Sequence, residues 1–93
     1  MNAEQASALK DAIQGIRHTV RNMPLSDCDL DDLDQLMSQA EAELDNTRPN
    51  MRALTVSLNS VARSLRTDPG ARHACLELDG AMRAAGVTSD WAN

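Results

Sequence analysis

The chain has 93 residues, fourteen Asp and Glu against nine Lys and Arg, a formal net charge of −5 and a pI near 4.7. It contains no Phe, no Tyr and one Trp, which argues against a β-sandwich or β-barrel, because pleated sheets favour aromatic and β-branched residues. The acidic balance and the missing aromatic side chains also argue against direct nucleic-acid binding, which uses cations for the phosphates and rings for the bases.

The first predicted helix covers about 3–22. Its apolar residues recur at alternating steps of three and four, as on one face of an α-helix. They are Ala6, Leu9, Ile13, Ile16, Val20 and Met23. Asn2 and Gln5 can form a reciprocal cap at its start. Pro24 closes it, because the residue before a proline is displaced from the α region.

The second predicted helix covers 27–45 and carries the strongest start signal. Ser26 is placed to cap it, with Asp29 at the third helical position, and Leu25 and Leu30 occupy the two positions of a hydrophobic staple. A row of apolar residues at helical spacing follows in the sequence, and we call this row the apolar seam. The apolar seam consists of Leu33, Met37, Ala40 and Leu44.

Two further helices are predicted over about 48–66 and 69–85, followed by a C-terminal tail at 87–93. Thr47 is the expected cap of the third helix, with Pro49 in its first turn, where a missing N–H costs nothing. Asp68 and Pro69 are typical of a helix start. The fourth helix should end at Gly86 in a left-handed C-cap, and Gly80 inside it is a point at which it could break.

These elements predict an all-α fold, a small antiparallel bundle of about four helices in a single domain spanning 1–93, because short connections make sequential helices antiparallel neighbours. Large apolar residues are few for a bundle of this size, so a second copy could complete the core as a homodimer. No apolar run reaches the length of a membrane span and no signal-peptide core follows Met1. We therefore expect a cytoplasmic protein.

Charge is concentrated in the second predicted helix. Between residues 24 and 47 there are eight acids and no base, whereas 48–72 holds five Arg and a single acid. Five of the acids repeat at steps of four and three, with Ser38 filling the gap, and form an acidic stripe about 27 Å long beside the apolar seam. The acidic stripe consists of Asp27, Asp31, Asp34, Glu41 and Asp45. The other three acids, Asp29, Asp32 and Glu43, fall on the opposite flank of the seam.

The acidic stripe has two competing interpretations. In the first, the acids pair with Arg52 and Arg66 of the next helix and keep the surface hydrated. Such exposed pairs contribute only about 0–1 kcal/mol each, so stability alone gives little reason to gather eight acids. In the second, the stripe is a partner surface, since carboxylates one helical turn apart, about 5–6 Å, can occupy a groove built for phosphates.

A calcium site at the start of this helix is not supported. The acids at 27, 29 and 31 match the first ligand spacings of an EF-hand loop. The loop needs Gly where Asp32 stands and a closing Glu where Ser38 stands. No Gly-rich phosphate loop is present either, so neither a metal nor a cofactor is expected.

Other residues of types that often take part in catalysis or metal binding do not form a recognisable site in the sequence. Cys75 lies in an apolar row and is expected to be a buried thiol, and His18 and His73 point away from their apolar rows. Two Cys and two His without a zinc spacing or a nucleophile signature give no case for an enzyme. Trp91 is expected either to dock on its own bundle or to anchor a partner, since Trp often dominates interfaces.

In size, charge and helix content the chain resembles nuclease-neutralising immunity proteins and the small phage-encoded inhibitors of nucleic-acid-guided defence, including anti-CRISPR proteins, although no motif matches residue by residue. The resemblance implies an inhibitor that blocks a basic, nucleic-acid-handling protein, with the acidic stripe contacting the Arg and Lys groups that hold phosphates. The alternative is a homo-oligomeric helical adaptor, secretion chaperone or antiactivator that uses its apolar seam as the interface.

Overall fold

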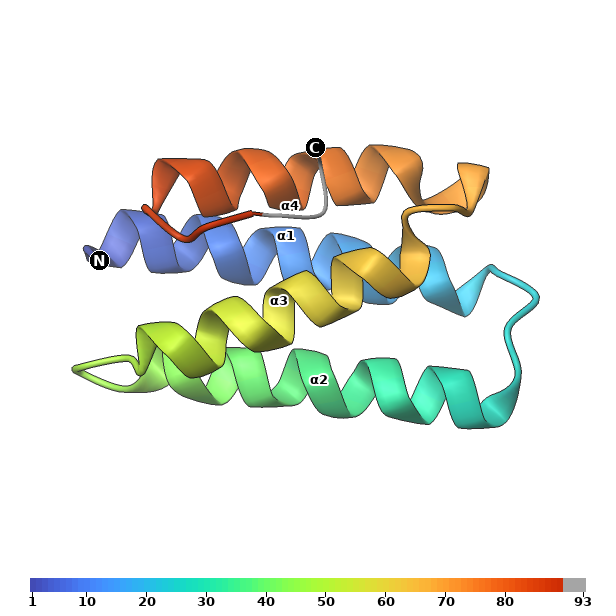
Figure 1. Cartoon of the computed structure of the whole chain (residues 1–93), viewed down its shortest axis with the longest axis horizontal. Helices are drawn as coiled ribbons and strands as arrows, with labels where there is room; N and C mark the ends of the chain where they lie inside the picture. The colour runs from blue at the N-terminus through green and yellow to red at the C-terminus, as the bar shows by residue number, and fades with distance from the viewer. Residues whose placement is uncertain (90–93) are drawn as a thin grey trace.

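The computed structural model describes residues 1–89, which form an up-down-up-down bundle (Figure 1). The α-helices of this part are α1 (Ala3–Arg21), α2 (Asp27–Asp45), α3 (Met51–Leu65) and α4 (Arg72–Ala84), and a 3₁₀ turn, η1 (Pro69–Ala71), precedes α4. The predicted all-α fold of about four antiparallel helices is confirmed. No helix within 1–89 combines the length and apolarity that crossing a bilayer requires.

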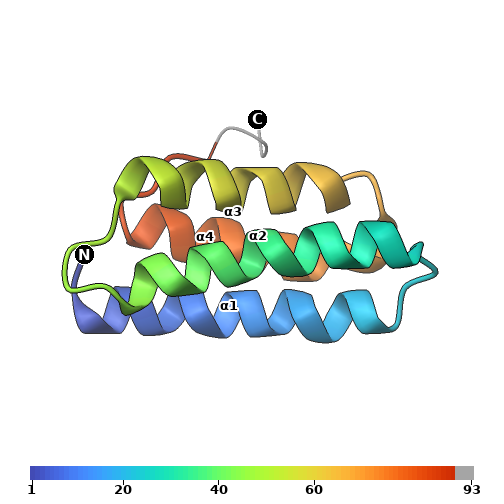
Figure 2. The same cartoon turned by 90° about the horizontal axis from the view of Figure 1, so that it is seen from below.

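The helices pack in two layers, α1 with α4 and α2 with α3, and α2 lies between α1 and α3 (Figure 2). The apolar rows of all four helices meet in one core. Leu33 and Met37 are at most 4 % exposed, so the apolar seam of α2 faces inward as predicted. The core closes within one chain, because these seam residues pack against α1 and α3 of the same molecule.

Several helix ends follow the sequence signals. Asn2 and Gln5 accept each other's backbone N–H, and the Ser26 side chain accepts from the N–H of Asp29 at 3.2 Å. Gly86 adopts φ +76° at the end of α4, and the N–H of Val87 donates to the carbonyl of Met82 at 2.8 Å. This is the left-handed cap that the glycine predicted. The helix continues unbroken through Gly80.

One predicted helix start is wrong, and another is confirmed with a different first turn. The third helix begins at Met51 rather than 48, and its cap is Asn50, whose side chain accepts from the N–H of Ala53 at 3.1 Å, not Thr47. The fourth starts at Pro69 with Asp68 as its cap, as predicted. Its first turn is the 3₁₀ turn η1, because the Asp68 carboxylate accepts the N–H of Gly70 and the N–H of Ala71 donates to the carbonyl of Asp68, three residues back. The α-helix follows only from Arg72.

After α4 the chain turns back and runs beside α4 toward α3 (Figure 1). Val87 is buried, and the carbonyl of Thr88 accepts from Nδ2 of the buried Asn59 at 2.8 Å. The hydroxyl of Ser89 donates to Asp79 at 2.6 Å. Residues 87–89 therefore form a C-terminal strap across α3 and α4. The predicted role of Trp91 lies outside the described residues.

Candidate partner-binding surface

The middle of the acidic stripe faces α1, where Arg17 holds it. The guanidinium of Arg17 bonds to Glu41, with Nε at 3.1 Å from Oε1, forms an ion pair with Asp34 and donates to Ser38 Oγ at 3.1 Å. The side chain of Arg17 is 18 % exposed. This burial acts to lower the pKa of Arg17, but the bonds and charges of Glu41 and Asp34 outweigh it and raise that pKa.

Farther along α2, the stripe contacts α1 again. Lys10 forms an ion pair with Asp45, and Nε2 of Gln14 donates to Glu41 at 3.0 Å. Three of the five stripe carboxylates, Asp34, Glu41 and Asp45, are therefore paired within the chain, but with α1, not with Arg52 and Arg66 of the next helix as the first interpretation expected.

Three of the predicted partner-binding residues thus have a structural role. Asp34 and Asp45 keep about two thirds of their side-chain surface exposed and Glu41 about a quarter. A partner that reached them would have to compete with Lys10 and Arg17, which reduces the energy that any new ion pair can supply.

The acids in the first two turns of α2 are different. Within residues 1–89 none of the four is in an ion pair, and all four are exposed. We call them the free acidic patch, which consists of Asp27, Asp29, Asp31 and Asp32. Two belong to the acidic stripe, and the other two lie on the flank that faces α3.

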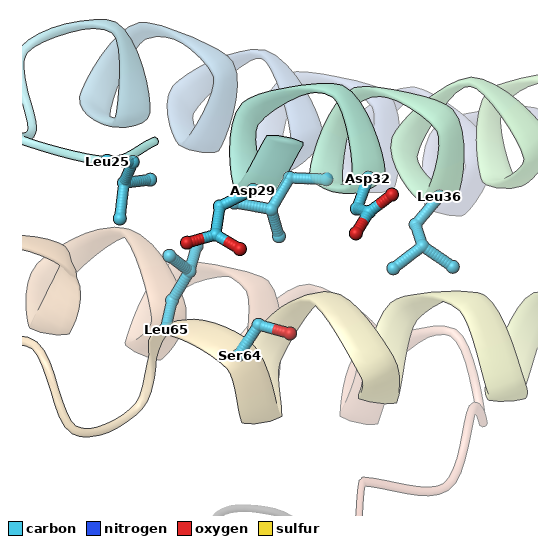
Figure 3. A pocket seen from close by; sticks show the side chains of 7 residues that line it. Leu25, Asp29, Asp32, Leu36, Ser64 and Leu65 are labelled. Carbon is cyan, nitrogen blue, oxygen red and sulfur yellow. The ribbon is translucent and has the colours of Figure 1, made fainter. Parts of the chain in front are cut away.

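A groove between α2 and α3 adjoins this patch (Figure 3). It has a volume of about 300 Å³, and its walls are apolar except for two carboxylates and one hydroxyl. We call it the α2–α3 groove, which is lined by Leu25, Asp29, Asp32, Leu33, Leu36, Ser64 and Leu65. Figure 3 shows Asp29 and Asp32 on α2 above Ser64 and Leu65 on α3.

The predicted site omitted Asp29 and Asp32, although helical spacing had placed them on the flank of the apolar seam opposite to the acidic stripe. The signal that could have found the groove was the run of small residues on α3, Ser57, Ser60 and Ser64. Small side chains on α3 leave space between α3 and the neighbouring helix α2. The larger side chains of α2 line only one wall of that space. The third acid of that flank, Glu43, instead accepts the N–H of Asn50 at 2.9 Å.

The other residues with potential chemistry lie apart. Cys75 is buried, and burial raises the pKa of its thiol. Cys28, His18 and His73 are exposed, and Nε2 of His73 lies 3.0 Å from Glu77 on the same helix. Within the described residues, no three Cys, His or acidic side chains are grouped as metal ligands.

Comparisons with known proteins identify no relative from which a function could be assigned to this surface. No protein-family model, no curated protein and no solved structure matches the chain. The candidate surface is therefore defined by the chain's own geometry, the free acidic patch and the α2–α3 groove beside it.

Proposed function

We propose that this protein is a non-enzymatic acidic binding protein that inhibits a basic, nucleic-acid-handling partner by occupying its phosphate-binding surface. The observation that supports the proposal is the free acidic patch, four exposed carboxylates on the first two turns of one rigid helix without ion pairs to the described residues. The partner's Arg and Lys side chains would meet these carboxylates in place of phosphates.

Helix stability does not explain the patch. An acid in the first turn of a helix stabilises it by about 0.3–1 kcal/mol through the helix dipole, an effect that fades beyond that turn. Asp31 and Asp32 lie beyond the first turn and repel Asp27 and Asp29. A cluster of like charge instead attracts a basic partner over long range and speeds its association.

The seam-based alternative, a homo-oligomeric adaptor, needs an apolar surface that a second chain can reach. In the structure the apolar seam is buried inside one chain, so this function would require the bundle to open. Light scattering measures the outcome directly, and a stable dimer that persists at high salt would favour the adaptor.

The proposal is tested by capture from the native host at low salt, followed by mass spectrometry. The bait carrying Asp27→Lys and Asp31→Lys is compared with a matched control carrying Glu4→Lys and Asp11→Lys. Each pair reverses one first-turn acid and one later exposed acid, on α2 and α1 respectively.

We expect the wild-type and control baits to retain a basic protein that added nucleic acid displaces, and the α2 variant to lose it. Raising salt from about 0.05 to 0.5 M should weaken the same complex, because exposed charges are then screened. The proposal would be refuted if the α2 substitutions did not reduce capture of the basic protein, or if nucleic acid failed to displace that protein.

A further inference from the structure

The α2–α3 groove is the start of a longer channel on the same side of the bundle. A second hollow of about 420 Å³ shares Asp32, Leu36 and Ser64 with it and is also lined by Gln35 and Gln39. A third, of about 330 Å³, begins at Gln39 and is lined on α3 by Arg52, Ala53, Val56 and Ser57. From Leu25, two residues before α2, to Gln39 the channel spans roughly 21 Å, about four helical turns.

The channel is open along its length and is most apolar at its Leu25 end, whereas Asp32, Gln35 and Gln39 line its middle beside Leu36. Leu33 and Leu65 are at most 4 % exposed and form its base, while Leu36 is half-buried in its wall. Val56 at the far end is 60 % exposed, the highest value among the exposed large apolar side chains of the described residues. A ligand with an apolar stripe about four turns long would cover this surface.

Charge differs between the two ends of the channel. Asp29 and Asp32 lie at one end without ion pairs to other residues of 1–89, and Arg52 is exposed at the other. Arg66, which is close in sequence to the acidic end, lies on the opposite flank of α3, the flank of Asn59. The channel is therefore acidic at its Leu25 end and basic at its Val56 end.

We propose that this channel binds an amphipathic helix of the basic partner, with apolar side chains on the leucines and Lys or Arg residues over Asp29 and Asp32. The proposal deepens the proposed function, on which it rests, by naming the element of the partner that is recognised. Binding of an apolar helix face in a groove supplies the affinity, and the charge at each end of the channel fixes the direction of the helix.

The test uses synthetic helical peptides of about 14 residues, the length that spans roughly 21 Å. One carries a leucine stripe with Lys in its first half and Glu in its second, and the other has the same composition with Lys and Glu mixed evenly along its length. Binding is followed by chemical-shift changes in the ¹⁵N spectrum of the whole protein. Ser64→Trp fills the channel, and Ser7→Trp on the exposed face of α1 is its control.

We expect saturable shifts at Leu36, Gln39 and Ser64, with the peptide of segregated charge binding about tenfold more tightly than the peptide of mixed charge. Ser64→Trp should weaken the tighter peptide at least about tenfold, and Asp29→Asn with Asp32→Asn about fivefold, while Ser7→Trp leaves it unchanged. Equal binding of the two peptides, shifts confined to α1 and α4, or no saturable shift at about 1 mM peptide would each overturn the channel proposal.

Failure here is distinguishable from failure of the proposed function. If the peptides do not use the channel but capture of the host partner still depends on Asp27 and Asp31, the inhibitor proposal stands and the helix-binding channel falls. If the peptides bind the channel but capture is insensitive to the patch, the function falls and the channel remains.

Discussion

At the scale of single residues, the two glycines of the α4 region have opposite roles. Gly80 lies inside the helix, where an added Cβ would meet no atom within 4 Å, whereas Gly86 adopts φ +76°. Gly80→Ala should therefore stabilise the protein by about 0.5–1 kcal/mol, because glycine loses more backbone entropy on folding. Urea unfolding measures the change.

Gly86→Ala is the matched control in the same region. A side chain in the left-handed conformation costs about 1–2 kcal/mol, so this substitution should destabilise. A loss of stability in Gly80→Ala would mean that the helix does not continue through residue 80 as the structure shows.

The carboxylate of Asp79 should make the protein sensitive to acid. The hydroxyl of Ser89 lowers the pKa of Asp79, burial opposes this, and Arg83 lowers that pKa further. A carboxyl whose pKa is lower in the folded state stabilises the protein above its unfolded value, about 3.9, and this contribution is lost as the pH falls through the lower folded value.

Ser89→Ala removes the main cause of that shift. The free energy of unfolding, measured in urea at several pH values between about 6 and 2, should fall less steeply with acid in the variant than in the wild type. Identical slopes in the two proteins would show that the bond between Ser89 and Asp79 does not form in solution.

At the scale of elements, a buried amide on α3 holds the C-terminal strap against that helix. Asn59 is 5 % exposed, and its Nδ2 donates to the carbonyls of Thr55 and Thr88. Asn59→Ala should cost about 1–3 kcal/mol, since the Thr88 carbonyl loses its protein donor. It should also speed hydrogen exchange at the amide of Val87, because the strap would be released from α3.

Ser57→Ala provides the comparison, because Ser57 is also buried on α3 but faces α2. It should change stability by less than about 0.5 kcal/mol and leave Val87 exchange unaltered. Equal exchange rates in the two variants would argue that the strap is held without Asn59.

The element boundaries show which helix ends can be predicted from the neighbouring residues alone. The starts of α1 and α2 and the end of α4 were predicted correctly, because each depends on one cap residue and its near neighbours. The start of α3 was not predicted correctly, because Asn46, Thr47 and Asn50 are all good caps within five residues. The choice is made by Glu43, seven residues away, which accepts the N–H of Asn50.

At the scale of the whole molecule, the sequence placed the acids on two flanks of the apolar seam but could not say which helix lies on each flank. The four helices of a bundle can follow one another clockwise or anticlockwise around the core, and both arrangements bury the same apolar rows. The structure sets α1 against the acidic stripe, so that Arg17 rather than Arg52 or Arg66 meets Asp34 and Glu41. Position along α2 then separates paired acids from free ones, because Asp27 and Asp31 belong to the same stripe but form no ion pair with the described residues. The predicted site did not make this distinction.

The α2 carboxylates are divided into paired acids, which contact α1, and free acids near the start of the helix. The paired acids hold α1 against α2, and the free acids contribute little to stability, since exposed like charges gain nothing from their neighbours. Two variants test the division with the same change in charge. One neutralises the paired acids by Asp34→Asn and Glu41→Gln, and the other neutralises free acids by Asp31→Asn and Asp32→Asn.

The most direct measurement is the free energy of unfolding of these two variants in urea at neutral pH and low salt. We expect a loss of about 1 kcal/mol or more in the first variant, because Arg17 is left partly buried with weakened partners. We expect no loss, or a small gain, in the second. Equal losses in both variants, or a larger loss in the second, would contradict the division between paired and free acids.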